Sequence, residues 1–476
     1  MPTAADAAIA SLESAGLASI ILKPGHHDFE ARANSSWSRT VRCRPWAIVQ
    51  PRCTNHVCAA VKAIVATPDC NFAIRSGGHS PWPAAANINR GILIDLGLMV
   101  GTTYNPDTQI ASILPGGTWT QVYTELEKHG RMVAGGREGH IGVGGLILGG
   151  GIGYQTCRVG FTCDQVVNFV LVDSTGTALD VNASSHPDLF RALKGGGNNF
   201  GIVTRFDMAT FAAPTAFLHG SINYALDAAP HVVKAYIDHV CNLAQRPDIH
   251  LILTWEVCPN QDCLIRLMTF GLDGIKDHPD LLPFINIPSA QTDLQLSTIA
   301  TNVASFLMPS DKENIWFSAT FKANPQVILH AATIYPSMLS HIKSHDSSGD
   351  FYSLLSFQPL LASFAQRSHQ NVIGIDAADG DCIVLCLVIQ VSSPSLLNDI
   401  VIPAAKALVA NLEDFARSLD AFVPWRYANY CSPDQDPGAA FGPRNLSFVR
   451  HVAARYDPHA VFQNRVPGGV KIPPPQ

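Results

Sequence analysis

The sequence has few features that would connect it to nucleic acid or to a membrane. Its 476 residues carry a formal net charge of −6, and Lys and Arg do not cluster with interleaved aromatic residues. We therefore expect no nucleic-acid partner. The most apolar run, CIVLCLVIQV at residues 382–391, has about half the roughly 20 residues of a membrane-spanning helix. It is typical of a buried strand, and we expect no membrane segment.

The N-terminus and the cysteines exclude further classes of protein. Residues 1–25 lack a basic region ahead of an apolar stretch, so we predict no secretory signal and expect a cytoplasmic protein. Twelve cysteines are spread thinly over the chain, which favours free buried thiols over disulfides. The cysteine pairs lack zinc-type spacing with partner histidines, so we predict no metal site.

Length and glycine distribution indicate two domains. A chain of this length exceeds what one hydrophobic core usually organises. From about residue 41, short strands and helices alternate with glycine-rich turns, whereas after about residue 211 glycine thins out and apolar strands alternate with helices. We predict an α+β protein with a first domain at residues 1–211, a second at 212–424 built as an antiparallel sheet covered by helices, and a segment at 425–476 that returns to the first.

Four glycine-rich segments, around Gly77, Gly116, Gly144 and Gly196, follow or precede short predicted strands. Glycine backbone can approach a pyrophosphate closely, so these segments together favour a phosphate-containing cofactor. They match neither a P-loop, because the Gly-Lys-Ser/Thr ending is missing, nor a dinucleotide fingerprint, because strand, glycine turn, helix and acidic residue do not follow in the required order. For His79, within IRSGGHSPW at 74–82, two interpretations are open. The segment is either an ordinary glycine-rich turn with a solvated histidine or a loop that brings the imidazole against a cofactor.

An ordered series of motifs resembles a known family. The series includes FAIRSGGHSPWP, LPGGTWTQVYTELEKHG, GVGGLILGGGIGY, DQVVNFVLVDSTG, DLFRALKGGGNNFGIVTRF and YANYCSPDQDP. It is similar to the FAD-linked oxidases of the vanillyl-alcohol oxidase and p-cresol methylhydroxylase (PCMH) class, in the fungal type of the berberine-bridge-enzyme-like branch. The resemblance implies a two-lobe FAD-binding PCMH-type fold with a separate substrate domain, an oxidoreductase that uses O2 and a small-molecule substrate, and a monomer or homodimer.

The resemblance gives His79 a role, because the matching histidine of the family is bonded to the 8α-methyl group of FAD. A neutral imidazole is a suitable nucleophile, and Gly77 and Gly78 remove Cβ atoms that would obstruct the approach. Many relatives add a second bond through a cysteine, but that position is Glu138 here. We therefore expect a single covalent bond, through His79. Glu138 and His140 would face the isoalloxazine edge or simply lie on the loop surface.

The same resemblance distributes further residues along FAD. The residues implied are Arg75, Ser76, Gly77, Gly78 and Ser80 near the pyrophosphate, Gly116, Gly117 and Thr118 beside them, Gly144, Gly145, Gly149 and Tyr154 along the ribityl and adenine arm, Gly201 and Val203 at the adenine end, and Asn429 in the C-terminal motif.

Oxidation of a substrate by a flavin also needs a proton acceptor over the ring. Relatives use a glutamate on a substrate-domain strand or a tyrosine of the C-terminal motif. The strand position is Gln358 here, which cannot act as a base. Tyr430 is the preferred candidate for the proton acceptor and Tyr427 is the second. We expect the flavin environment to lower the pKa of this tyrosine. Glu138 is a third candidate catalytic residue, and Glu256 is a weaker alternative base.

The substrate-domain strands are rich in Leu, Ile, Val and Phe, which favours an apolar small molecule of secondary metabolism over a sugar. We expect hydride transfer to a histidyl-linked flavin that O2 reoxidises. Two alternatives remain: a cyclase or isomerase on the same scaffold without net redox change, and a flavin-carrying binding protein without turnover.

Overall fold

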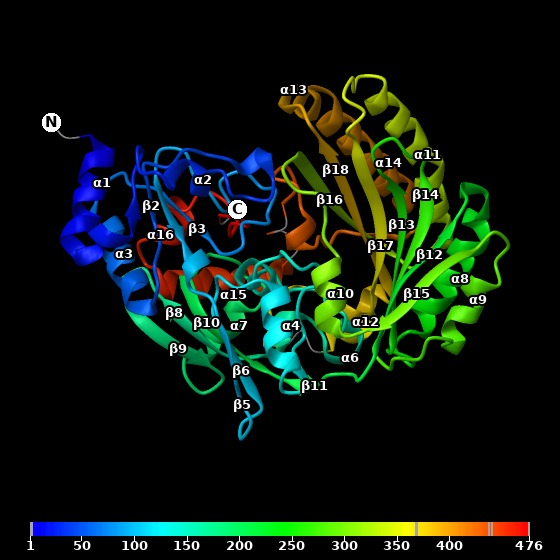
Figure 1. The fold of residues 1–476 in the computed structure, drawn as a ribbon, viewed down its shortest axis with the longest axis horizontal. Helices are drawn as coiled ribbons and strands as arrows, with labels where there is room; N and C mark the ends of the chain where they lie inside the picture. The colour runs from blue at the N-terminus through cyan, green and yellow to red at the C-terminus, as the bar shows by residue number, and fades with distance from the viewer. Residues whose placement is uncertain (1–2, 367–369, 437, 439–440, 475–476) are drawn as a thin grey trace.

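The chain folds into two lobes. The structure, a computed structural model, describes residues 3–366, 370–436, 438 and 441–474. Figure 1 shows the first lobe on the left, built from the N-terminal part, coloured blue through cyan to blue-green, together with the red C-terminal part. The second lobe is on the right and is built from the green, yellow and orange middle part. Helices and antiparallel sheets both contribute, as expected for the predicted α+β class.

The first lobe contains a small sheet that ends at the His79 loop. Its strand order is β1-β2-β4-β3, in which β2, β4 and β3 are parallel and β1 is antiparallel at the edge. The helix between β2 and β3 buries Val57, Ala60, Val61 and Ile64, which share one helical face. The bounds are α1 Ala4–Leu12, β1 Ile21–Leu22, α2 Phe29–Ala33, β2 Ala47–Val49, α3 Thr54–Ala66, β3 Phe72–Arg75 and β4 Ile92–Asp95.

A second sheet of this lobe is antiparallel, in the order β5-β6-β10-β8-β9. The β8–β9 hairpin turns at Ser174–Thr177. Three of the glycine-rich segments lie within or directly beside short helices of this lobe. The bounds are β5 Thr102–Asn105, β6 Ile110–Ile113, α4 Trp119–Glu127, β7 Arg131–Met132, α5 Val143–Leu148, α6 Thr156–Val159, β8 Val166–Val172, β9 Ala178–Asn182, α7 Pro187–Leu193, β10 Ile202–Ala209 and β11 Phe211–Ala212.

The second lobe is one large antiparallel sheet in the order β15-β12-β14-β13-β17-β18-β16-β19. The apolar run at 382–391 forms β18, and every one of its residues is buried because the strand lies between β17 and β16. The bounds are β12 Phe217–Tyr224, β13 Ile249–Val257, β14 Leu264–Gly271, β15 Gln291–Ser297, β16 Glu313–Lys322, β17 Tyr352–Leu360, β18 Cys382–Val391 and β19 Phe422–Val423.

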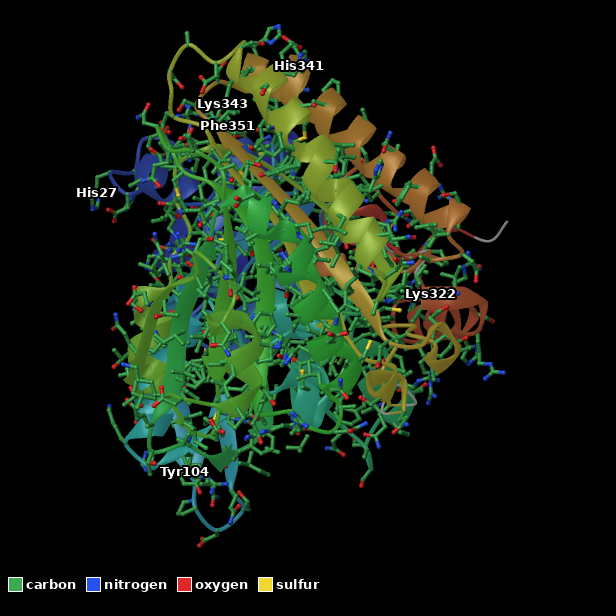
Figure 2. The ribbon with its side chains drawn as sticks, turned by 90° about the vertical axis from the view of Figure 1, so that its right-hand side faces the viewer. His27, Tyr104, Lys322, His341, Lys343 and Phe351 are labelled. Carbon is green, nitrogen blue, oxygen red and sulfur yellow. The ribbon has the colours of Figure 1, made fainter. Side chains whose placement is uncertain are left out.

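Helices cover the outer face of the large sheet. Figure 2 looks onto this face, where α11 and α14 run side by side and His341 and Lys343 mark one end of α11. The segment Pro394–Ser418 is long and apolar enough to cross a membrane by length and composition, but α14 packs against α11 and β16. The bounds are α8 Ala229–Asn242, α9 Leu282–Ile285, α10 Ile299–Ser305, α11 Pro325–Lys343, α12 Ala362–Ala365, α13 Pro394–Leu396 and α14 Ile402–Ser418.

The C-terminal part lies in the first lobe, where α15 (Gly442–Tyr456) contacts α7 and α16 (Val461–Asn464) follows it. Phe462 packs edge-on against Phe72 of β3, with ring centroids 5.9 Å apart. Arg465 donates hydrogen bonds to the backbone carbonyls of Ile64, Thr67 and Cys70. This segment therefore helps to hold the small sheet that ends at the His79 loop, while the domain boundaries remain predictions.

Candidate active site

Buried charges anchor the His79 loop from below. Arg75, the last residue of β3, donates to Asp95 at the end of β4, and Arg32 forms a second ion pair with the same carboxylate. Asp95 is fully buried. Burial opposes its ionisation, but hydrogen bonds and charges from Arg32 and Arg75 hold the pKa of Asp95 at about 2. The two parallel strands therefore end at a fixed position.

The glycine-rich loops contact one another without intervening side chains. A Cβ on Gly77 would lie 2.5 Å from the Cα of Gly142, so both positions exclude larger residues. Ser76 Oγ donates to the carbonyl of Pro115 and accepts from the backbone N–H of Gly144 at 3.1 Å. Three segments that are distant in sequence thus meet with their backbones exposed toward one cavity.

His79 lies in the wall of this cavity. Its imidazole stacks on Trp37 at a centroid distance of 4.3 Å, and its buried Nε2 has no hydrogen-bond partner among the described residues. Burial lowers the pKa of His79 to about 3, and His140 acts in the same direction. The ring is therefore neutral at physiological pH and can act as a nucleophile.

Glu138 lies beside His79, with its Oε2 3.5 Å from the histidine Nε2. The same oxygen accepts the backbone N–H groups of His140 and Ile141, each at 2.9 Å, and Oε1 accepts that of Met308 at 3.3 Å. Burial raises the pKa of Glu138 above its usual value, although these N–H groups act the other way. Glu138 therefore links its own loop to the second lobe by hydrogen bonds, and it also lines the cavity. His140 is exposed.

The C-terminal motif lines the cavity and contacts the glycine-rich segment at residues 149–152. The hydroxyl of Tyr427 accepts from the backbone N–H of Ile152 at 2.9 Å and from Asn429 Nδ2 at 3.1 Å. Asn429 lies so close to the glycine loop that a Cβ on Gly149 would meet its Oδ1 at 2.0 Å. Tyr427 and Tyr430 pack edge to face, with ring centroids 4.7 Å apart. Tyr427 is thus fixed by hydrogen bonds.

Tyr430 belongs to a hydrogen-bond network centred on Arg137. Arg137 donates to the hydroxyl of Tyr430 at 2.9 Å, to Gln358 Oε1 at 2.7 Å and to His250 Nε2 at 3.0 Å. Burial raises the pKa of Tyr430, while Arg137 and Gln358 act in the opposite direction. We expected a lowered pKa from the sequence, and burial of the phenol is the reason that the protein alone gives a raised one.

The second lobe contributes a mostly apolar wall. Its cavity-lining residues are Ile252, Thr254, Met268, Phe270, Phe306, Met308, Trp316, Leu354, Ser356, Gln358, Cys386 and Val388. This set, taken from the described residues, contains no carboxylate. Glu256, the alternative base, lies outside the cavity lining because it is bound to Arg266 and accepts from the hydroxyl of Tyr352.

Most of the predicted site residues meet in this cavity. Those that line it are Ser76, Gly77, Gly78, His79, Ser80, Glu138, Gly144, Gly145, Gly149, Gly201, Val203, Tyr427, Asn429 and Tyr430.

Five residues that we predicted to contact FAD are not among the lining residues of the cavity. Arg75 is committed to Asp95, and Tyr154 is buried with its hydroxyl bonded to Arg137 and Asn302. Gly116 packs against the carbonyl of Leu96, where a Cβ would come within 2.1 Å. Gly117 and Thr118 directly precede α4, and Thr118 is its N-cap and forms a capping box with Gln121. These residues support the loops and are not among the lining residues.

Sequence reasoning missed Arg137, His250 and Trp37. Arg137 could have been noticed in the sequence, because it is the only Lys or Arg in the glycine-dense stretch 134–154 and directly precedes Glu138. His250 and Trp37 reach the site only through the packing of distant strands and loops, which no local pattern indicates. The described residues also include one exposed trio with metal-ligand spacing, His26, His27 and Asp28, which is not part of the cavity lining.

The comparisons agree with this geometry. Residues 45–182 match the FAD binding domain family. The FAD-dependent monooxygenase drtC of Aspergillus calidoustus is 32% identical over 474 residues, covering 97% of this chain and 89% of that protein. The chain belongs to the FAD-linked oxidoreductases. The resemblance found in the sequence is thereby confirmed, as is the FAD cofactor that it implied.

Solved structures show the same fold for this FAD-linked oxidoreductase. The glucooligosaccharide oxidase of Acremonium strictum, which carries a 6-S-cysteinyl, 8α-N1-histidyl FAD, superposes with a TM-score of 0.79 at 20% identity, covering 97% of this chain and 99% of that one. The berberine-bridge-enzyme-like protein 1 of Physcomitrella patens gives a TM-score of 0.78 at 19% identity, with 98% and 99% covered. The predicted two-lobe PCMH-type fold is confirmed.

The residues of the cavity fit FAD. Its glycine loops offer backbone where a Cβ would collide with a neighbouring loop, as at Gly77 and Gly149. A neutral, buried His79 lines the same cavity. Such a combination suits a cofactor with a pyrophosphate and a reactive ring methyl group.

Proposed function

We propose that this FAD-linked oxidoreductase is an oxidase whose FAD is bonded covalently to His79, and that it oxidises an apolar small molecule with O2 as the electron acceptor. The observation that carries the proposal is the neutral imidazole of His79, which lines the cavity among the glycine loops. With Glu138 at the position of the second tether, a thioether cannot form there. The predominantly apolar second-lobe wall supports an apolar substrate.

The cavity suggests how the chain would hold its cofactor. Backbone at Gly77, Gly78, Gly144 and Gly145 would accept the pyrophosphate and ribityl arm, while Gly201 and Val203 would lie at the adenine end. FAD accepts a hydride and passes the electrons to O2. The remaining tasks belong to side chains: orienting the substrate, excluding water and accepting a proton.

Tyr430 is the proposed proton acceptor. It is the one tyrosine of the C-terminal motif that is bonded to a cation, since Arg137 donates to its hydroxyl. A guanidinium in this position stabilises the phenolate relative to the phenol. Because burial raises the pKa of Tyr430 in the protein alone, we expect proton transfer to become favourable as pH rises.

A second candidate function is cyclisation or isomerisation without net oxidation. It is favoured by the absence of a carboxylate from the described second-lobe wall of the cavity, and by a Tyr430 that stays protonated near neutral pH and can donate a proton. The name of drtC suggests a third outcome, insertion of an oxygen atom into the substrate.

The covalent bond is tested by denaturing the purified protein. We expect the SDS-denatured band to fluoresce as a flavin, and His79→Ala to abolish this fluorescence while leaving FAD bound without a covalent bond. Glu138→Gln, Cys157→Ser and Cys163→Ser should each keep the label. FAD found by peptide mass mapping on a cysteine, or on no residue, would contradict the assignment of His79.

The type of reaction is tested by peroxide release in a screen of small apolar alcohols, phenols and acids. An oxidase releases about one hydrogen peroxide per product, since O2 accepts both electrons. Product without peroxide under anaerobic conditions would indicate the cyclase or isomerase. Product that contains 18O from labelled O2, again without stoichiometric peroxide, would indicate a monooxygenase.

A further inference from the structure

The guanidinium of Arg137 lies in the cavity wall without a negatively charged partner. Its three hydrogen-bond acceptors are His250, Gln358 and the hydroxyl of Tyr430. Burial and the nearby Arg137 charge hold the pKa of His250 well below its usual value, so its ring is neutral and accepts the bond. Within the described parts of the chain, no carboxylate oxygen lies within 4.0 Å of an Arg137 nitrogen.

This arrangement leaves both charge and hydrogen-bonding capacity unused. A guanidinium has five N–H donors, and three are occupied by these neutral acceptors. A partly buried cation without a counter-ion costs free energy, because desolvation is not offset by an opposite charge. An anion bound in the cavity would supply that charge and the missing acceptors.

The residues around Arg137 indicate which part of the cavity such an anion would occupy. Its partners stand on β13, on β17 and in the C-terminal motif, which is the side of the cavity that faces the second lobe. Thr254, two strand positions on the same face from Ile252, also lines the cavity, and its buried hydroxyl has no partner among the described residues. The glycine loops predicted to hold FAD contribute none of these groups.

We propose that Arg137 binds an anionic oxygen group of the substrate, so that the enzyme acts on apolar molecules that carry a carboxylate or a comparably acidic hydroxyl. This inference rests on the proposed function, because it assigns the ligand of the same cavity. The oxyanion replaces water at the unused guanidinium donors, while the apolar remainder contacts the walls formed by Phe270, Leu354 and Val388. Arg137 then both selects the substrate and places it beside Tyr430.

Binding of matched probes to the FAD-loaded protein tests the proposal, with the flavin absorbance spectrum as the readout. The probes are 2-naphthoate and benzoate, each paired with its neutral amide, and 2-naphthol above and below its own pKa. We expect the acids to bind about 10- to 100-fold more tightly than the amides, as for a charge-assisted hydrogen bond. The naphthol titration distinguishes a carboxylate from an acidic hydroxyl as the preferred anion.

Variants separate the charge from the shape of the site. Arg137→Gln should remove the preference for the acids, and Arg137→Lys should keep part of it. Gln358→Glu should also abolish the preference, because the new carboxylate would stand at the present 2.7 Å contact and neutralise the guanidinium. Arg131→Gln is the matched control, since Arg131 bonds Gln109 and Thr210 and does not line the cavity.

Each result supports or overturns the proposal. Equal binding of acids and amides, binding of neither, or an acid preference that survives in Arg137→Gln would overturn it. A change confined to the flavin reduction potential of Arg137→Gln would also overturn it, because Arg137 would then serve the cofactor. Protein that holds no FAD would instead contradict the proposed function, and flavin content is therefore measured first.

Discussion

The two walls of the cavity are built in different ways. The first-lobe wall consists of backbone: Gly77 and Gly142 approach so closely that a Cβ would collide, and the buried Asp95 fixes the strand ends below. The second-lobe wall consists largely of side chains from β13, β14, β16, β17 and β18, and it is joined to the C-terminal motif through Arg137. The first wall suits a cofactor shared by a whole family, whereas the second can change its ligand by single substitutions.

The largest expected effect concerns the foundation of the first wall. Asp95→Asn should lower the free energy of unfolding by about 3–5 kcal/mol at pH 7, because Arg75 would remain buried without its counter-ion. The depressed pKa of Asp95 means that its contribution is present above the unfolded-state pKa and is lost as pH falls toward about 2. Urea unfolding of both proteins should therefore give curves that converge in acid. Parallel loss at all pH values would contradict this account.

Tyr430→Phe addresses the second wall. We expect turnover with any substrate found in the peroxide screen to fall about 100-fold, the usual size of a lost proton transfer. Because burial raises the pKa of Tyr430, the wild-type rate should increase with pH through the alkaline range, and the variant should lose this slope.

Tyr427→Phe is the matched control for this test, since its hydroxyl accepts from Ile152 and Asn429 and makes no bond to Arg137. It should keep the pH slope of turnover. If Tyr430→Phe kept the slope as well, Tyr430 would not be the proton acceptor.

The difference between the walls also explains what the sequence could predict. The loop around His79, the glycine segments and strand 382–391 were predictable, because glycine density and continuous apolar runs are local signals. The roles of Arg75 and Tyr154 were not, since an ion pair with Asp95 and a bond to Asn302 depend on packing between distant segments. Arg137 illustrates the same limit: its position was visible, but its partners on β13 and β17 were not.

A smaller effect is expected where the two walls touch. Gly149→Ala should lower the free energy of unfolding by about 1–3 kcal/mol, because its Cβ would lie 2.0 Å from Asn429 Oδ1. The double variant Gly149→Ala/Asn429→Ala should be less destabilised than the sum of the single variants. Gly145→Ala, which would meet nothing within 4 Å, should stay close to wild type. Thermal unfolding and FAD content measure both effects, and strict additivity would mean that Asn429 does not cause the constraint.

The smallest effect is expected at Glu256, which lies on the strand that supplies His250 and Thr254 but outside the cavity. Its carboxylate is already bound to Arg266 Nε at 2.8 Å and to the hydroxyl of Tyr352 at 3.0 Å. Glu256→Gln keeps an acceptor for Tyr352 and weakens a single ion pair, so we expect stability to fall by about 1 kcal/mol or less and the turnover rate to stay within about twofold of wild type. A proton acceptor would instead lose about 100-fold or more on this substitution. Peroxide release by Glu256→Gln and Tyr430→Phe, measured side by side with one substrate, therefore decides which side chain accepts the proton. A large loss of turnover in Glu256→Gln alone would mean that Glu256, and not Tyr430, is the proton acceptor.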